Sequence, residues 1–366
     1  MDRRSFLRTS TFGGAAAAAS TLAAPAVAQG RTTCVIVSTW PRGLPGLGTG
    51  AERLAAAITA ATDGAITTEY YAAGERVGAF DSFDAVAAGD AQAYHGADYY
   101  WKGKHPAWSY VTAVPFGLTS VEQNAWIHHL GGQQLWDELG DEFGIKGHLA
   151  GNTGLQMGGW FNKEMNTAED FRGLRMRIPG IGGDMMANMG VSVVSLPGGQ
   201  IYENLVSGAI DATEWVGPWN DYFLNLHQAA RYYYWPGVHE PGAALSMGFN
   251  KSWLTSLPTW QQKAIEAVCL SENDLMLAEF NANNGAYLQR LVNDHGVQLR
   301  EFNDDIYDAF GDAAEATFDV IRQHSDLANR FHDSFVAARA AVGGWLNITD
   351  RSEEHTSELE SLTNLV

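Results

Sequence analysis

The chain has 366 residues, of which 46% are hydrophobic, and a formal net charge of −19. A chain of this length and composition can bury more than one ordinary domain, so we expect two lobes. The acidic balance argues against nucleic acid and anionic lipid as partners, although solubility alone would also explain it.

Residues 1–28 have the pattern of an export signal. Arg3-Arg4 precede a weakly apolar run at 12–24, and Ala26-Val27-Ala28 supplies a small-x-small cleavage site. Paired arginines followed by Phe6-Leu7 are typical of a twin-arginine signal, and an ordinary Sec signal with two chance arginines is the alternative. Either signal predicts export to the periplasm.

Residues 351–366 differ abruptly in composition from the segment before them. We interpret them as a non-native tail rather than a genuine polar tail, and we leave them out of the fold prediction. Without the signal and this tail the net charge stays near −18, so the acidic character belongs to the folded part of the chain.

The first part of the chain alternates between strand and helix patterns. In order, the predicted elements are a buried strand at 32–40, a helix at 50–62, a strand at 66–71, a helix at 80–89, a strand at 91–97 and one long amphipathic helix at 121–143. This alternation predicts a parallel sheet flanked by helices.

A second α/β lobe is predicted to begin near Gly154. The elements from here on are strand-like segments at 148–160, 174–178, 191–196, 209–216 and 243–249, a helix at 258–294, a strand at 297–302, and helices at 305–322 and 325–341. The helix at 258–294 would make about ten turns, which is long enough to lie across both lobes. Because no flexible linker separates the lobes, we expect a hinge with any ligand held between them.

One glycine motif offers an enzymatic interpretation. Gly46-Leu47-Gly48-Thr49-Gly50-Ala51 matches Gly-x-Gly-x-x-Ala after a strand, and Glu69 stands where a ribose-binding acid would be expected. However, six residues beginning with Trp40-Pro41 separate the strand from the glycines, whereas a dinucleotide turn follows its strand directly. An exported NAD(P)-dependent oxidoreductase is therefore kept as an alternative, and a loop that opens a helix is the simpler interpretation.

Other catalytic and metal patterns receive no support from the sequence. There is no Gly-x-Ser-x-Gly elbow and no zinc-type spacing, and the adjacent His128 and His129 cannot chelate one ion from a helix. Cys34 and Cys269 lie in apolar and helical contexts, so we predict buried thiols rather than a disulfide.

Polar residues stand at the ends of apolar strands in the second lobe. Arg177 ends one such strand, and an arginine fork there suits a carboxylate because it makes two charge-assisted hydrogen bonds. A structural ion pair between Arg177 and Glu214 is the alternative. Gln156 and Glu214 offer hard oxygen ligands, which suit Na⁺ or Ca²⁺ better than zinc.

From its signal to about residue 345 the chain resembles the solute receptors of tripartite ATP-independent periplasmic (TRAP) transporters, most closely their 2-oxo-acid-binding branch. The segments that carry the resemblance are 99–104, 151–161, 174–177, 210–218 and 232–237. The resemblance implies an α/β, two-lobed periplasmic-binding-protein clamshell, type II-like, with a long helix spanning both lobes. It places residues 29–153 plus 243–285 in one lobe and 154–242 plus 286–350 in the other.

The resemblance also implies the site. Arg177 would hold the ligand carboxylate, while Gln156, Glu214 and the carbonyl of Trp215 would hold a cation that meets the ligand oxygens. The remaining residues implied for the pocket wall are Tyr100, Asn152 and Glu240. Val238-His239 stand where relatives have bulkier aromatics, so we expect a larger pocket.

The same resemblance implies the function. The chain is expected to be a receptor, not an enzyme, and to bind a small 2-oxo or 2-hydroxy monocarboxylate that it delivers to a TRAP permease. A ligand carboxylate, Glu214 and Glu240 sum to more negative charge than Arg177 balances, so Ca²⁺ would neutralise the cleft, while Na⁺ would require a protonated or remote Glu240. A receptor for an ABC importer is a further alternative, which would not need the cation site. The sequence does not decide whether the receptor forms a homodimer.

Overall fold

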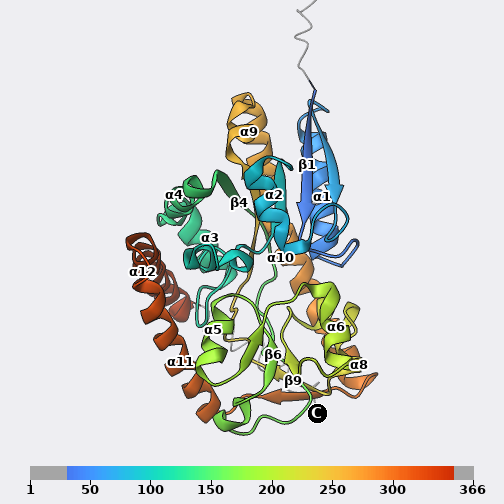
Figure 1. Cartoon of the computed structure of the whole chain (residues 1–366), viewed down its shortest axis with the longest axis vertical. Helices are drawn as coiled ribbons and strands as arrows, with labels where there is room; N and C mark the ends of the chain where they lie inside the picture. Colours follow the sequence, from blue (N-terminus) through green and yellow to red (C-terminus); the bar gives the residue numbers. More distant parts are fainter. Residues whose placement is uncertain (1–30, 350–366) are drawn as a thin grey trace, which may run out of the picture.

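The computed structural model describes residues 31–349 (Figure 1). The predicted export signal at 1–28 and the predicted non-native tail at 351–366 lie outside this range. Figure 1 shows two lobes, one above the other, each built around its own sheet. No helix in residues 31–349 has the combined length and apolar character needed to cross a membrane.

The sheet of the first lobe has five strands in the order β2-β1-β3-β10-β4. The strands are β1 (Thr32–Ser38), β2 (Ile66–Tyr71), β3 (Ala93–Gly96), β4 (Ile145–Asn152) and β10 (Ala244–Asn250). The parallel sheet predicted from the sequence is only partly correct, because β10 runs antiparallel to both β3 and β4. The chain returns from the second lobe directly into β10, which therefore starts at the junction of the lobes, where β3 and β4 end.

The sheet of the second lobe has six strands in the order β11-β9-β5-β8-β6-β7. The strands are β5 (Gly159–Phe161), β6 (Arg175–Arg177), β7 (Ser192–Val194), β8 (Ala212–Thr213), β9 (Tyr232–Trp235) and β11 (Gln298–Glu301). Strands β6 and β8 are parallel, so their carboxyl ends meet at one edge of the sheet. Strand β9 was not predicted from the periodicity, and its aromatic run contributes only to the family resemblance.

Helices cover the sheets of both lobes (Figure 1). In the first lobe they are α1 (Leu47–Ala61), α2 (Ser82–Ala88), α3 (Ser120–His129), α4 (Gly132–Phe143) and α9 (Lys251–Ser256). In the second they are α5 (Gly180–Asn188), α6 (Gly198–Val206), α7 (Pro218–Phe223), α8 (Leu226–Ala229) and α11 (Asp304–Arg322). The single helix predicted at 121–143 is wrong, because Gly131 has a φ of 94° and ends α3 before α4 begins.

Helix α10 (Thr259–Asn293) spans the two lobes, as the sequence predicted (Figure 1). Its Met276 packs at Gly151 of β4, and its Phe280 ring lies 5.2 Å from the Trp219 ring of α7. The same helix buries Cys269, and Cys34 is buried in β1; both are free thiols.

Helix α12 (Asp326–Thr349) follows α11 and packs back on the first lobe. Its Phe335 ring lies 5.3 Å from Tyr110 and 5.2 Å from Trp126 of α3. The lobe boundaries remain a proposal: one lobe is 29–153 plus 243–285, and the other is 154–242 plus 286–350. These boundaries assign α12 to the second lobe, although α12 packs on helices of the first lobe.

Candidate carboxylate and cation site

The candidate site lies where strand ends of both lobes meet. Arg177 is the last residue of β6, and Glu214 and Trp215 directly follow β8. Gln156 lies in the connection between β4 and β5, and Glu240 in the connection between β9 and β10. Polar side chains that ended apolar strands in the sequence are thus brought to one edge, the usual place for a ligand in α/β folds.

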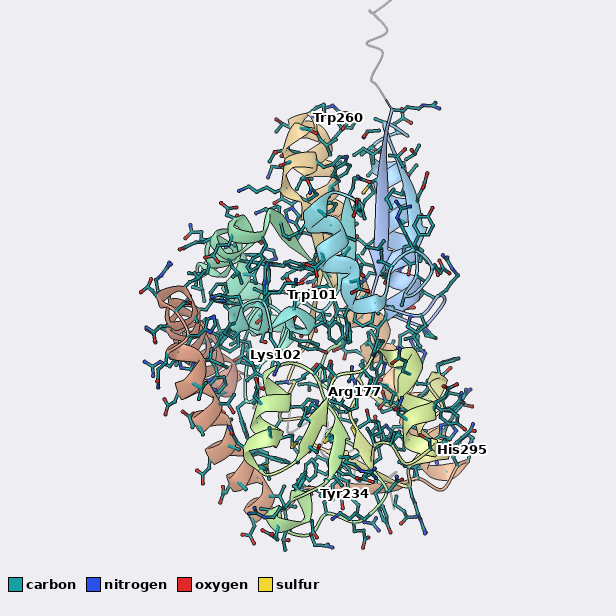
Figure 2. All side chains as sticks on the ribbon, viewed as in Figure 1. Trp101, Lys102, Arg177, Tyr234, Trp260 and His295 are labelled. Atoms are coloured by element: carbon teal, nitrogen blue, oxygen red, sulfur yellow. The ribbon has the colours of Figure 1, made fainter. Side chains whose placement is uncertain are left out.

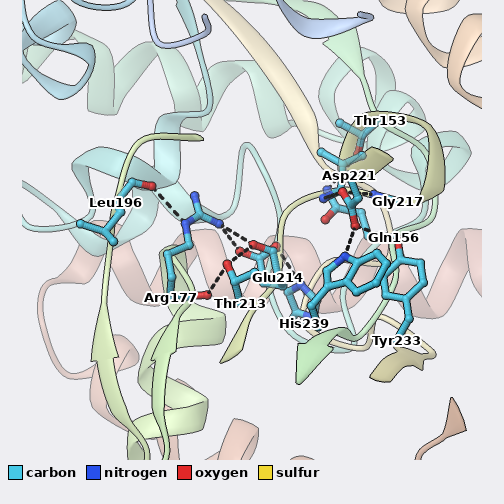
Figure 3. Close-up of polar contacts among 12 residues, drawn as sticks. Thr153, Gln156, Arg177, Leu196, Thr213, Glu214, Gly217, Asp221, Tyr233 and His239 are labelled. Atoms are coloured by element: carbon cyan, nitrogen blue, oxygen red, sulfur yellow. Dashed lines mark hydrogen bonds and ion pairs between the residues drawn. The ribbon is translucent and has the colours of Figure 1, made fainter. Parts of the chain in front are cut away.

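The guanidinium of Arg177 is 1% exposed and donates three hydrogen bonds (Figure 3). Its Nη1 donates to Glu214 Oε1 and, at 3.0 Å, to the Glu214 carbonyl, while Nε donates to the Leu196 carbonyl at 3.1 Å. Its Nη2 is buried and has no hydrogen-bond partner among residues 31–349. The structural ion pair with Glu214 is therefore present, and it leaves one arm of the arginine fork available for an anion.

The ring of Trp215 lies beneath this guanidinium, 5.1 Å from the guanidinium carbon to the ring centroid. This cation–π contact holds the fork in place without using any of its N–H groups. The Trp215 indole Nε1 in turn donates to Asn220 Oδ1 at 2.6 Å. Arg177 is thus oriented by contacts that do not compete with a carboxylate ligand.

Two buried carboxyl groups face this arginine. Glu214 and Glu240 are both buried, and the ligand atoms of Glu214, His239 and Glu240 all lie within 4.8 Å of one another. Burial raises the pKa of Glu240 well above its usual value, the charge of Glu214 raises it further, and Arg177 partly offsets both. Two acids beside one guanidinium leave an excess of negative charge that a bound cation would neutralise.

Gln156 and Asn152 add neutral polar groups. Gln156 Nε2 donates to Thr153 Oγ1 at 3.0 Å, and Gln156 Oε1 is buried with no hydrogen-bond partner in the described part of the chain. Asn152 Oδ1 accepts from the Gly154 N–H at 2.8 Å, and its Nδ2 likewise finds no partner there. The free amide oxygen of Gln156 suits a hard cation, whereas the free Nδ2 of Asn152 suits an anionic or carbonyl oxygen.

Asp221 was missed by the sequence analysis. Its Oδ1 accepts the Val216 and Gly217 N–H groups at 3.1 and 3.0 Å, and its Oδ2 accepts Trp160 Nε1 at 2.8 Å and the Tyr233 hydroxyl at 2.7 Å (Figure 3). Burial raises the pKa of Asp221 to about 6, although each of these donors lowers it. This carboxyl group fixes the backbone that follows Trp215, and its only signal in the sequence was an acid three residues after Pro218.

The first lobe supplies the aromatic wall of the site. Tyr100 lies in the 3₁₀ turn Asp98–Trp101, and burial raises the pKa of its hydroxyl to about 12. The lobes touch across the site, where the Trp40 and Trp215 rings lie 6.2 Å apart between centroids. The cavity lined by Trp40, Tyr99, Tyr100, Gln156 and Trp215 measures about 10 Å³, room for about one water molecule.

The glycine motif has a packing role in this structure. A Cβ at Gly46 would lie 2.7 Å from the Phe280 ring, and one at Gly50 would lie 2.3 Å from Met276 Cε. Both contacts are with α10, so the small residues let α1 approach the long helix closely. Glu69 is exposed on β2, outside the cleft.

Comparison with known proteins places the chain in a family. The model of the bacterial extracellular solute-binding protein family 7 matches residues 37–323. The chain is 36% identical to a monocarboxylate 2-oxoacid-binding periplasmic protein of a Nostoc species, over 97% of this chain and 98% of the relative.

Solved structures agree with this relative. A TRAP transporter solute-binding protein from Bordetella bronchiseptica, a dimer with calcium and picolinate, is 31% identical with a TM-score of 0.87 and covers 90% of this chain and 97% of its own. A TRAP periplasmic solute-binding protein from Pseudoalteromonas atlantica with bound sodium and pyruvate is 33% identical with a TM-score of 0.86, over 90% and 99%. The chain therefore belongs to the bacterial extracellular solute-binding protein family 7, the family of these TRAP transporter receptors.

Proposed function

We propose that this chain is a periplasmic receptor that closes on a small 2-oxo or 2-hydroxy monocarboxylate together with a cation, and then presents the ligand to a TRAP permease. The observation that carries the proposal is the buried, unpartnered Nη2 of Arg177 next to two buried acids. An unpaired buried N–H costs free energy, and a carboxylate would satisfy it.

Each residue has a distinct role in this proposal. Arg177 binds the ligand carboxylate through its free arm. Gln156 Oε1, Glu214 and the Trp215 carbonyl hold the cation, which would polarise the 2-oxo or 2-hydroxy oxygen and bridge it to the protein. The residues that complete the pocket wall are Tyr100, Asn152 and Glu240.

The proposed cation is Na⁺ or Ca²⁺. Solved relatives carry one or the other, bound with pyruvate or picolinate. Calcium would balance a ligand carboxylate and two ionised acids against Arg177, whereas sodium would fit if Glu240 keeps its proton, as its raised pKa favours.

No chemical step is proposed, and the protein acts as a carrier. Export through the predicted twin-arginine signal at 1–28 and cleavage after Ala28 belong to the same proposal. The family and its relatives are binding proteins, which favours a receptor over the oxidoreductase alternative.

Thermal unfolding of the purified chain with a panel of acids tests the proposal. We expect one 2-oxo or 2-hydroxy acid to raise the midpoint in the presence of Na⁺ or Ca²⁺, by about 2.7 kcal/mol of stabilisation at a hundredfold excess over the dissociation constant. Arg177→Lys keeps the positive charge beside Glu214 but loses the fork, so this response should disappear.

Arg175→Lys is the matched control, because Arg175 lies two residues away, is exposed and pairs with Asp211 outside the cleft. It should respond like the unchanged protein. A response to NAD(P) but to none of the acids would contradict the receptor and favour the oxidoreductase.

A further inference from the structure

His239 reaches the cation side of the site from the connection between β9 and β10. The residue is 2% exposed, and its Nε2 lies 3.3 Å from Glu214 Oε2 (Figure 3). Glu240, its neighbour in the chain, is also buried, and all three ligand atoms lie within 4.8 Å of one another. One imidazole nitrogen and two carboxylates therefore converge on one point.

The separation between His239 and Glu214 fits two ligands of one ion. Hydrogen bonds to a carboxylate are usually about 2.7–2.9 Å long, so 3.3 Å is long for such a bond. Two ligand atoms bound at about 2.1 Å with an angle of about 100° between them lie about 3.2 Å apart. A single ion could therefore contact Nε2 and Oε2 with shifts of a few tenths of an ångström.

Unpartnered oxygens point to an ion at the same place. Glu240 Oε2 and Gln156 Oε1 are both buried, and neither atom accepts a hydrogen bond in residues 31–349, although the side chains of Tyr99 and Gln156 come near enough to Glu240 to lower its pKa. A buried oxygen acceptor without a donor costs free energy, which a cation would recover. These two atoms are an observation independent of the His239–Glu214 distance.

We propose that His239 and Glu240 join Glu214 as ligands of the bound cation, and that the imidazole makes the site prefer a divalent ion of the Mn²⁺ or Zn²⁺ type over Na⁺ and Ca²⁺. Sodium and calcium are hard ions that take oxygen ligands, whereas imidazole suits first-row transition ions. The inference rests on the proposed function because it concerns the same cleft, and it assigns the choice of cation to a residue outside Gln156, Glu214 and Trp215.

Manganese is the probe that reports this ligand directly. The full chain, stripped with a chelator, is titrated with Mn²⁺ and with Ca²⁺, with and without pyruvate, and the Mn²⁺-loaded protein is examined by pulsed EPR. We expect a ¹⁴N coupling from a directly bound imidazole. In His239→Gln the coupling should vanish and the Mn²⁺ affinity should fall about 10–100-fold, while the Ca²⁺ affinity changes little.

The variants separate a ligand from a hydrogen-bond donor. His239→Gln keeps an N–H that can donate to Glu214, so a residue that only orients Glu214 would leave the preference for Mn²⁺ unchanged. His129→Gln is the matched control, because His129 is exposed at the end of α3 and is not part of the cluster of Glu214, His239 and Glu240. It should leave both the coupling and the affinities unchanged.

The outcomes distinguish this inference from the proposed function. Absence of Mn²⁺ binding, bound Mn²⁺ without ¹⁴N coupling, or equal losses of Mn²⁺ and Ca²⁺ affinity in His239→Gln would each overturn the inference. If the inference is overturned in one of these ways but pyruvate still binds and binding still requires Arg177, the proposed function holds without the inference. A nitrogen-coupled Mn²⁺ site in a chain that binds no carboxylate would support the inference and contradict the function.

Discussion

Glu214 contacts both Arg177 and His239, which lie on the proposed anion side and the proposed cation side of the cleft. One carboxylate oxygen accepts from Arg177, and the other faces His239 at 3.3 Å. Removing one partner of a buried ion pair leaves an uncompensated charge, which costs about 3–5 kcal/mol. Substitutions here therefore test binding only if they preserve charge, and this is why Arg177→Lys is more informative than Arg177→Ala.

Asp221 contacts the backbone that follows Trp215, one of the proposed cation ligands. Its four accepted hydrogen bonds hold the backbone after Trp215, so the Trp215 carbonyl keeps its direction. In Asp221→Asn the single amide oxygen can accept either from Val216 and Gly217 or from Trp160 and Tyr233, but not from both pairs, and leaving a buried donor unpaired costs about 1–3 kcal/mol. We expect the cation affinity to fall about 10–100-fold, as for other residues that orient metal ligands.

Isothermal titration with Ca²⁺ measures this effect. Glu203→Gln provides a control for the loss of one carboxylate charge, because Glu203 is exposed on α6. An Asp221→Asn protein with unchanged Ca²⁺ affinity and lower thermal stability would reduce Asp221 to a purely structural role.

At the scale of elements, glycines decide where helices end and how closely they pack. The periodicity over 121–143 is continuous, so the sequence predicted one helix, but Gly131 adopts a left-handed conformation and separates α3 from α4. The motif at 46–51 resembled a nucleotide loop, yet it lets α1 approach α10. Gly131 and the glycines of the motif at 46–51 are visible in the sequence. Whether a glycine ends a helix, binds a nucleotide or allows close packing depends on neighbours that are distant in the chain.

Gly46→Ala tests the packing interpretation. Gly46 has a φ of 73°, and an added Cβ would lie 2.7 Å from the Phe280 ring, so both backbone strain and overpacking oppose the change. We expect a loss of about 3 kcal/mol in the free energy of unfolding, measured with urea.

Gly43→Ala separates the two causes of that loss. Gly43 has a φ of 66° and no atom within 4 Å of an added Cβ in the described chain, so only strain of about 1–2 kcal/mol applies. Equal losses in the two variants would show that contact with α10 is unimportant.

At the scale of the whole molecule, contacts between lobes hold the cleft closed. Lys102 Nζ lies 2.5 Å from Asp184 Oδ1 of α5, and Trp40 packs edge-on against Trp215 at 6.2 Å between centroids. Figure 2 shows Lys102 near the level where the lobes meet, above Arg177. Tyr99 and Tyr100 lie just before Lys102, so the short turn Asp98–Trp101 connects the aromatic wall of the proposed site to this contact between the lobes.

The Lys102–Asp184 pair should slow ligand release. The pair is partly exposed, and such pairs contribute about 0.2–1 kcal/mol, so Lys102→Met should speed dissociation about 2–5-fold, and high salt should reduce the difference. Stopped-flow measurement of the release of the bound acid gives this rate.

Lys104→Met is the matched control for closure. Lys104 pairs with Asp84 of α2 at 2.5 Å, within the first lobe, so its loss should not change the release rate. If both variants release the ligand equally fast, the Lys102–Asp184 pair has no special part in closure.

The sequence by itself determined the alternation of strands and helices, the helix that spans both lobes, and the polar residues that end apolar strands, including Arg177 and Glu214. These features follow from side-chain periodicity and from the cost of burying polar groups, which are local properties. Only the tertiary structure decided that β10 runs antiparallel, that α12 packs on the first lobe, and that Asp221 holds the backbone after Trp215. The tertiary structure also brings His239 into contact with Glu214, which is 25 residues away in the chain. Such contacts depend on how strands from distant parts of the chain are ordered in a sheet, and no local sequence pattern encodes that order.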